Sequence, residues 1–346
     1  PALEGLLLEA GSELTLTGYN LKTGIRTVVP ADITEEGSLV LSARLFGDIV
    51  RRLPDDVVTI ATDGYMVNIT CGMSEFNILG TDAGEFPELP TVEYQNSLIL
   101  PQQVLHSMIT ETIFAVSTND SRPIHTGELF ERSADGLLTV VAVDGYRLAL
   151  RREGTQMGVT DTACQFVIPA SALNEVSKIC GDTDETIEIV QGSRHIMFRI
   201  ENTTLITRRL EGEFLNYNQA IPSNNPISVS VDRRQLISSL ERCSLIITEQ
   251  QKSPLRCIFG DGVLTIRTAT AIGNAHDQCP IGGNGGDLEI GFNNKYILDA
   301  LKAAHADTLR INLNTPITPC IIEPEEEADN QRFLYMVLPV RLKAGQ

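Results

Sequence analysis

The sequence predicts an α+β fold made of three copies of one domain. Two observations carry this prediction: segments recur with a period of about 125 residues, and each copy mixes short strands with helix-period segments. The 346 residues are 42% hydrophobic and only 5% aromatic, with no Trp. A chain of this length exceeds one ordinary core at roughly 150 residues per domain, so we expect several cores filled by aliphatic side chains.

Three independent markers define the repeat. The Leu-Thr pairs that begin at Leu14, Leu138 and Leu264 are 124 and 126 residues apart. The segments LVLSARLFGDIVRRL, FVIPASALNEVSKIC and EIGFNNKYILDALKAA recur at 127 and 124 residues. GEFPELP returns as GEFLNYNQAIP after 128 residues. Markers that share one domain-sized period indicate a triplicated domain.

The markers predict domains at residues 1–95, 96–225 and 226–346. The second copy has a strand and a helix before Gly127, which is the counterpart of Gly5. We therefore expect the sequence to begin inside the first copy, without that copy's first strand and helix.

Each complete copy is predicted to hold two helices among many strands. Alternating or apolar runs that predict strands include LTLTG, SLIL, TIEIV, IMFRI, ISVSV and LTIRT. Helical periodicity covers residues 42–53, 101–116, 169–180, 231–247 and 292–304. The Gly-rich run at 282–286 predicts a flexible loop.

Cysteine and histidine spacing excludes several kinds of site. The seven cysteines are odd in number and never closer than fourteen residues, which fits neither disulfides nor zinc, so most are expected in the core. The five histidines form no HExxH motif, and we predict no metal and no cofactor. Without an apolar run of about 20 residues or a signal peptide, we expect a cytoplasmic protein that does not enter membranes.

An enzyme is the first rival interpretation. Asp63 and Asp144 both stand in DGY sequences and suggest paired carboxylates, but the repeat aligns them with different parts of their domains. No phosphate-binding loop or nucleophile-elbow motif is present. We predict no catalytic residues.

The distribution of charge along the sequence bears on whether the protein binds nucleic acid. A formal net charge of −18 argues, by itself, against nucleic acid, because phosphate binding depends on Lys and Arg. The five helical segments nevertheless sum to a formal charge of about +3. Solvated helix faces explain any single Lys or Arg, so the collective bias carries the inference that a basic helical face meets phosphates.

One stretch, VVAVDGYRLAL at residues 140–150, has an Asp-Gly turn between apolar runs. That pattern is typical of a plain β-hairpin and needs no function to explain it. It stands, however, in a series with LEGLLLEA, TGELFE, EFPELP, GFNNKYILDALKA and YMVLPVRL. In this order, and with the threefold repeat, these segments closely resemble the β sliding clamp family, the β subunit of bacterial DNA polymerase III, over the whole sequence.

The resemblance implies three clamp-type domains per chain, each with two helices packed on β-sheets, forming half of a six-domain ring. Two chains would close head to tail around double-stranded DNA without sequence preference. The ring would be a non-catalytic processivity factor that tethers the replicative polymerase, the clamp loader and other proteins with short linear motifs. A repeat-built scaffold that binds only proteins, without encircling DNA, is the alternative.

The resemblance also assigns a pocket for such peptides, with Arg147 as a polar anchor. The implied pocket residues are His125, Val143, Gly145, Tyr146, Arg147, Leu148, Leu215, Gln219, Ala220, Met336, Val337, Leu338, Pro339, Val340 and Arg341. Val143 stands where the family commonly has Thr, and Gln219 where Arg is frequent, so peptide preference is open.

Two further sets complete the expectations. Helical charge and the resemblance together give the candidate DNA-facing residues Arg44, Arg51, Arg122, Arg233, Arg234, Lys295 and Lys302. For the dimer interface, the resemblance implies that Phe76 and Ile78 on an edge strand meet Ile246 and Ile247 after a helix of the other chain, pairing strand edges otherwise open to aggregation.

Overall fold

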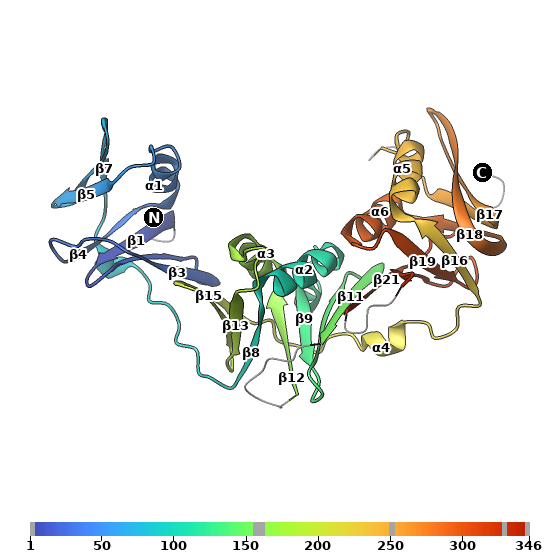
Figure 1. Cartoon of the computed structure of the whole chain (residues 1–346), viewed down its shortest axis with the longest axis horizontal. Helices are drawn as coiled ribbons and strands as arrows, with labels where there is room; N and C mark the ends of the chain where they lie inside the picture. The colour runs from blue at the N-terminus through green and yellow to red at the C-terminus, as the bar shows by residue number, and fades with distance from the viewer. Residues whose placement is uncertain (1–3, 155–162, 249–252, 327–330, 343–346) are drawn as a thin grey trace. The chain divides into compact units, whose positions relative to one another are not determined.

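The computed structural model describes residues 4–154, 163–248, 253–326 and 331–342 (Figure 1). The chain divides into two compact units, one of Pro1–Gln102 with Lys178–Arg209 and one of Gln103–Ser177 with Leu210–Gln346. Each unit is built around a large sheet whose strands come from two successive copies of the repeat. The units therefore cross the repeat boundaries, and the domain limits given above stay a prediction.

The first unit holds an eight-stranded antiparallel sheet in the order β4-β1-β2-β3-β15-β14-β13-β8. Its strands are β1 (Gly5–Ala10), β2 (Leu14–Tyr19), β3 (Thr23–Val29), β4 (Gly37–Ser42), β8 (Asn96–Pro101), β13 (Thr186–Gln191), β14 (His195–Ile200) and β15 (Thr203–Arg208). β3 and β15 join the two copies, with Thr27 opposite Thr203. A separate sheet contains β5 (Val58–Asp63), β6 (Met66–Cys71) and β7 (Ser74–Leu79).

The second unit holds a ten-stranded sheet in the order β12-β9-β10-β11-β21-β20-β19-β16-β18-β17. Its strands are β9 (Gly127–Arg132), β10 (Leu137–Val143), β11 (Arg147–Gly154), β12 (Cys164–Pro169), β16 (Ile227–Asp232), β17 (Leu255–Thr270), β18 (Gly273–Phe292), β19 (Thr308–Leu313), β20 (Cys320–Pro324) and β21 (Gln331–Val337). Here β11 and β21 join the second and third copies, with Leu148 opposite Met336. This pairing places the DGY turn beside the C-terminal strand.

Five helices confirm the five predicted segments. They are α1 (Ala43–Val50), α2 (Gln102–Thr112), α3 (Ala170–Ile179), α5 (Arg233–Ser244) and α6 (Asn294–Ala303). The sequence missed the short α4 (Tyr217–Ala220) and the 3₁₀ turns η2 (Ala83–Glu85), η3 (Ile113–Ala115) and η4 (Pro123–Thr126), which are too short for a helical period. In the third copy α5 and α6 pack together over one core that includes Leu236, Leu240, Ile297 and Leu301.

The second repeat marker is also a structural equivalence. Leu41, Ile168 and Phe292 each stand two residues before a helix, since α1, α3 and α6 begin at residues 43, 170 and 294. In the first and third copies the intervening residue caps the helix: Ser42 Oγ accepts from the Leu45 N–H, and Asn293 Oδ1 accepts from the N–H groups of residues 295 and 296. A polar cap after an apolar strand explains why these helices start in register.

The Gly-rich run at 282–286 is not the expected loop, because it belongs to β18. Asn284 pairs with Asp261 of β17, where the register shifts on either side. A side chain on Gly285 would come within 2.4 Å of the Phe259 carbonyl oxygen, and Gly283 and Gly286 have φ angles of 92° and 64°. The glycines thus permit close strand approach and a bulged backbone, which is their other common use in strands.

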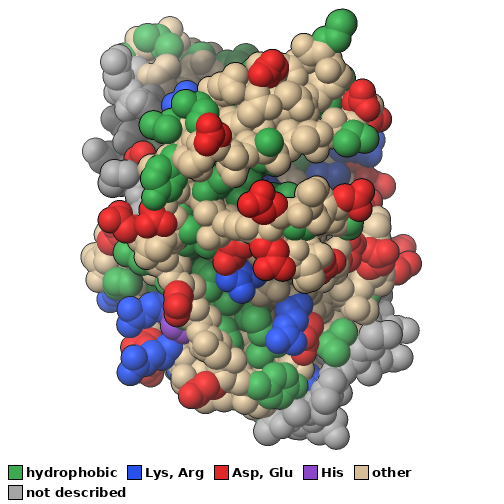
Figure 2. Space-filling view, turned by 90° about the vertical axis from the view of Figure 1, so that its left-hand side faces the viewer, with side chains coloured by type: hydrophobic (Ala, Val, Ile, Leu, Met, Phe, Trp, Pro, Cys, Tyr) green, Lys and Arg blue, Asp and Glu red, His purple; other side chains and the backbone are tan. Residues whose placement is uncertain are grey.

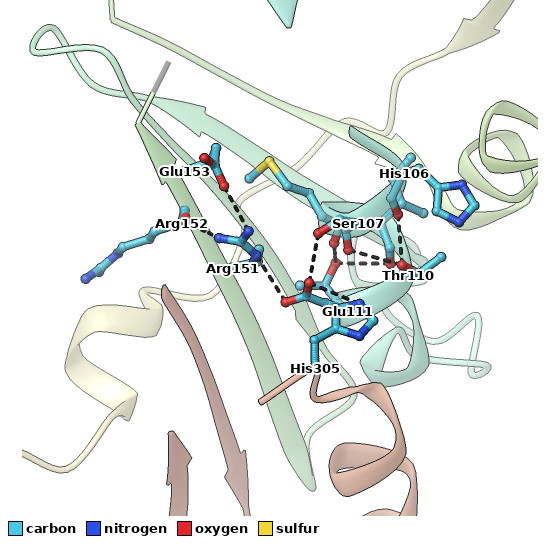
Figure 3. Close-up of polar contacts among 11 residues, drawn as sticks. His106, Ser107, Thr110, Glu111, Arg151, Arg152, Glu153 and His305 are labelled. Atoms are coloured by element: carbon cyan, nitrogen blue, oxygen red, sulfur yellow. Dashed lines mark hydrogen bonds and ion pairs between the residues drawn. The ribbon is translucent and has the colours of Figure 1, made fainter. Parts of the chain in front are cut away.

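A network of buried charges lies where α2 meets β11 (Figure 3). Arg151 Nε contacts Glu111 Oε2 at 3.1 Å, and its guanidinium contacts Glu153 at 2.8 Å, with all three side chains at most 10% exposed. Glu111 also accepts a 2.8 Å hydrogen bond from Ser107 Oγ. His305, which follows α6, approaches the same carboxylate at 3.3 Å. The network thereby ties the second copy's helix and strand to the third copy.

The cysteines behave as the sequence predicts. All seven are free, and six of them are buried, with only Cys164 partly exposed. Burial raises the pKa of the Cys320 thiol to about 12, so this group is a neutral core side chain at physiological pH.

Candidate functional site

A cavity of about 630 Å³ opens beside the turn between β10 and β11. Its lining residues are Ser117, Asn119, Ser121, Arg122, His125, Val143, Asp144, Gly145, Tyr146, Arg147, Leu148, Leu215, Ala220, Pro319, Met336 and Leu338. They come from four separate parts of the second unit: the segment around η4, the β10–β11 hairpin, the segment leading into α4, and the C-terminal strand region. Apolar and polar side chains contribute about equally to this lining, which suits a ligand that has both apolar anchors and polar groups.

Ten of the fifteen residues implied for the pocket line this cavity. They are His125, Val143, Gly145, Tyr146, Arg147, Leu148, Leu215, Ala220, Met336 and Leu338. Two of them, Leu148 and Met336, are paired across β11 and β21 and are nearly fully buried, so they form its floor.

The other five lie off the cavity wall, and strand alternation explains the clearest case. Val337 is fully buried in the third copy's core with Tyr335, whereas Met336 belongs to the cluster on the opposite face of β21. Val340 lies past the strand and donates its N–H to the Gly291 carbonyl at 2.8 Å. The remaining three residues do not line the cavity either: Gln219, Pro339 and Arg341.

The DGY turn is held by its own aspartate. Asp144 Oδ1 accepts from the N–H groups of Tyr146 and Arg147 at 2.9 and 3.0 Å, and Gly145 adopts a φ of 89° that favours glycine. The C-terminal segment secures the turn from the other side, since the Leu338 N–H donates to the Tyr146 carbonyl at 2.8 Å. Asp144, considered above as a catalytic carboxylate, therefore has a structural role.

Arg147, the expected polar anchor of the pocket, is held by two carboxylates. Its side chain is only 7% exposed, and its guanidinium pairs with Asp144 at 2.8 Å and with Asp299 at 2.7 Å. The same group stacks over the Tyr296 ring at 4.6 Å. Arg147 thus lines the cavity as a fixed part of its wall.

The wall opposite the hairpin comes from the segment that enters α4. Leu215 is 43% exposed at the cavity. Tyr217, the first residue of α4, is buried, and its hydroxyl donates a hydrogen bond to the Glu131 carboxylate. Burial, with the neighbouring Glu131 carboxylate, raises the pKa of Tyr217 to about 12, so this hydrogen bond persists over the physiological pH range. It anchors the segment that carries Leu215 and Ala220.

Polar side chains line the rim of the cavity, and of these the resemblance implied His125 but not Arg122. Arg122, assigned above to DNA, lines the cavity near His125, whose ring packs edge-on against Phe214 at 5.3 Å. Burial and the nearby Arg122 charge lower the pKa of His125, so its imidazole is neutral at pH 7. Ser117, Asn119, Ser121 and Pro319 carried no sequence signal, because loop residues reach this rim only through the fold.

The other candidate DNA-facing residues differ in how freely they present charge. Arg44 and Lys295 are exposed, and Arg234 is 80% exposed with Asp307 at 3.9 Å. Three have local partners that reduce their availability. Arg51 pairs with Asp48, Lys302 pairs with Glu241, and Arg233 donates to the Ala306 carbonyl.

Of the four predicted interface residues, Phe76 is exposed, whereas Ile78, Ile246 and Ile247 are partly buried. Phe76 is 36% exposed on β7, and within the described residues β7 pairs only with β6. From the side on which β5 and β7 lie in Figure 1, hydrophobic side chains are seen scattered among many acidic ones (Figure 2). Ile78 and Ile247, in contrast, pack partly into their own cores. Leu245, the residue just after α5 and next to Ile246, is 81% exposed and was not among the predicted residues.

The remaining observations concern metals and membranes. In the described ranges, no three His, Cys, Asp or Glu side chains come together as a metal site would require. Among the same residues, no helix combines the length and apolar character needed to cross a bilayer.

Family models for the DNA polymerase III beta subunit match nearly the whole chain. The N-terminal domain model matches residues 1–90, the central domain model residues 99–216 and the C-terminal domain model residues 218–341. The beta sliding clamp of Halalkalibacterium halodurans is 34% identical over 357 residues, covering 99% of this chain and 92% of that protein. That of Staphylococcus aureus is 32% identical over 353 residues, with the same coverages.

Solved structures agree. A putative DNA polymerase III beta subunit from Eubacterium rectale superposes with a TM-score of 0.90 at 34% identity, covering 98% of this chain and 91% of that one. The Bacillus subtilis sliding clamp gives 0.91 at 29% identity, with coverages of 99% and 92%. The Pseudomonas aeruginosa sliding clamp bound to griselimycin gives 0.91 at 28% identity, with the same coverages. The chain therefore belongs to the DNA polymerase III beta subunit family, the beta sliding clamps.

Proposed function

We propose that two copies of this chain close head to tail into a six-domain ring around duplex DNA and tether the replicative polymerase. The proposal rests most on the ordered match of all three clamp domains along the chain. As a beta sliding clamp, the chain is a non-catalytic processivity subunit, and the scaffold that binds only proteins is not favoured. A head-to-tail contact closes into a ring when three domains per chain each turn the path by about sixty degrees.

DNA contact in this proposal is electrostatic and independent of sequence. The exposed Arg44, Arg234 and Lys295 are the strongest of the seven proposed positions, because Arg234 has only a distant, exposed partner in Asp307. Arg51, Arg233 and Lys302 have closer partners, and Arg122 lines the cavity. We place the domain limits at residues 1–95, 96–225 and 226–346 and the protein in the cytoplasm, a location supported by its seven free cysteines.

Topological retention tests the ring. After incubation with its clamp loader and ATP, the protein is expected to stay on nicked circular DNA through a high-salt wash that screens phosphate contacts. It should leave when a restriction enzyme linearises the same circle, because a ring slides off free ends. Equal retention on linear and circular DNA, measured by gel filtration, would contradict encirclement.

The cavity beside the DGY turn is the proposed binding site for partner peptides. Its floor of Leu148 and Met336, with Leu215 beside it, fits one or two apolar anchors from an extended segment. Burial of one Leu or Phe supplies about 1.5–3 kcal/mol. Ordering a flexible peptide offsets part of this, so single-site binding is expected to be weak and strengthened by two sites per ring.

The probe is a fluorescent QLSLF-type peptide, because the family resemblance implies partners that carry motifs of this kind. Leu215→Asp should weaken its binding at least about tenfold, since it puts a carboxylate beside the apolar anchors. Leu215 is a better position than Leu148, because Leu148 is 1% exposed and an aspartate there would disrupt the sheet. Leu21→Asp is the matched control, as Leu21 is 57% exposed and does not line the cavity. Fluorescence anisotropy measures affinity and circular dichroism the fold; equal binding by Leu215→Asp and Leu21→Asp would reject this site.

A further inference from the structure

Asp299 of α6 does not line the cavity, yet it holds a side chain that does. Its Oδ2 atom lies 2.7 Å from the Arg147 guanidinium, 152 residues away in the sequence. Asp299 is not among the pocket residues that the family resemblance implies. The contact connects a helix of the third copy directly to the hairpin of the second.

The surroundings leave Arg147 a single well-defined position. Asp144 accepts from its Nε at 2.8 Å, and the guanidinium carbon lies 4.6 Å and 5.4 Å from the ring centres of Tyr296 and Phe114. Tyr146 stacks on Tyr296 at 5.7 Å. Asp144 belongs to the same hairpin as Arg147, so it moves with the turn. Asp299 supplies the charge that fixes the turn to another element.

The position of Asp299 is itself rigidly set. The Asn293 cap fixes the start of α6, and Ile297, Ala300 and Leu301 bury its inner face in the third copy's core. The Asp299 side chain is 31% exposed, so the ion pair lies at the edge of the buried region. A carboxylate on a packed helix is a fixed reference point for a long and otherwise flexible arginine.

We propose that Asp299 is a positioning residue for the peptide pocket, acting through Arg147. It holds the guanidinium against Tyr296 and thereby keeps the Asp144–Leu148 wall in the shape that receives a peptide. Peptide affinity then depends on α6 even though the Asp299 carboxylate does not touch the peptide. This inference rests on the proposed peptide site, and preorganisation of the wall is its physical basis.

Asp299→Ala is expected to weaken binding of the QLSLF-type peptide about tenfold, within the range for residues that act on a site without touching its ligand. Asp299→Asn keeps an oxygen acceptor without the charge and should lose only about threefold. In an Arg147→Met background, Asp299→Ala should have no further effect, because the group it positions is gone. This cycle separates positioning through Arg147 from a general structural role, which would weaken binding in both backgrounds.

Glu241→Ala is the control in the third copy, since Glu241 pairs with Lys302 and not with Arg147, and both side chains of that pair are about half exposed. It should leave peptide affinity unchanged, and thermal unfolding by circular dichroism should match wild type for it and for Asp299→Asn. Wild-type affinity for Asp299→Ala, or an undiminished Asp299→Ala effect without Arg147, would overturn the inference. Failure of the wild-type protein to bind the peptide would instead reject the proposed peptide site.

Discussion

Glu111→Ala should lower the free energy of unfolding by about 3 kcal/mol, the lower end of the range for removing one partner of a buried ion pair. Glu111 is 3% exposed, and its loss leaves the Arg151 guanidinium with Glu153 as its remaining carboxylate (Figure 3). Ser107 and His305 lose a contact at the same time. Urea unfolding followed by circular dichroism measures the change in free energy. Circular dichroism replaces Trp fluorescence as the signal, because the protein has no Trp.

Glu241→Ala is the matched control, a helical glutamate whose pair with Lys302 is about half exposed. A surface pair of this kind contributes only about 0–1 kcal/mol. The double variant Glu111→Leu/Arg151→Met should recover part of the loss, since apolar replacement of a buried pair is often close to neutral. If Glu111→Ala and Glu241→Ala lowered the free energy of unfolding equally, burial would not determine how much the Glu111 network contributes to stability.

Leu245→Asp should convert the proposed dimer to monomer, raising its dissociation constant about hundredfold. Leu245 directly follows α5 and is 81% exposed, so its apolar side chain is available to a second copy and an aspartate there should not disturb the fold. Burying an unpaired carboxylate at an interface opposes association. Sedimentation equilibrium over a concentration series measures the effect.

Ile246 and Ile247, which the family resemblance implies for the interface, are less suitable for this test than Leu245, because they are partly buried. Ile247 packs against the third copy's core, so its truncation changes stability as well as association. Ile317→Asp is the control for Leu245→Asp, because Ile317 is 67% exposed in the turn before β20. A dimer that survives Leu245→Asp as well as it survives Ile317→Asp would place the interface elsewhere.

Several structural features follow from sequence alone because they depend on local chemistry. The helix starts after Leu41 and Phe292 are encoded by an apolar strand followed by a capping residue, Ser42 or Asn293. The Asp-Gly turn is encoded by an aspartate that bonds its own backbone and a glycine with positive φ. Triplication is visible because the same local patterns recur at one spacing.

The local sequence pattern did not predict the environment of residues whose neighbours come from distant segments. The glycines at 282–286 have the composition of a loop, yet β17 approaches closely enough to need them in a strand. The resemblance implies Arg147 as a polar anchor, and only the fold shows that Asp299 pairs with it from a separate helix. Met336 and Val337 are adjacent and both apolar, and only the pairing of β21 assigns one to the cavity and the other to the core.

The sequence by itself determined the three copies, the five long helices and the family, and through the family resemblance ten of the sixteen residues that line the cavity. The tertiary structure alone decided that four separated segments meet at one cavity, that Arg122 stands at its rim and that Asp299 holds Arg147. The physical reason is the range of the interactions: caps, turns and periodicity act over a few residues, whereas ion pairs and sheet registers join groups more than a hundred residues apart.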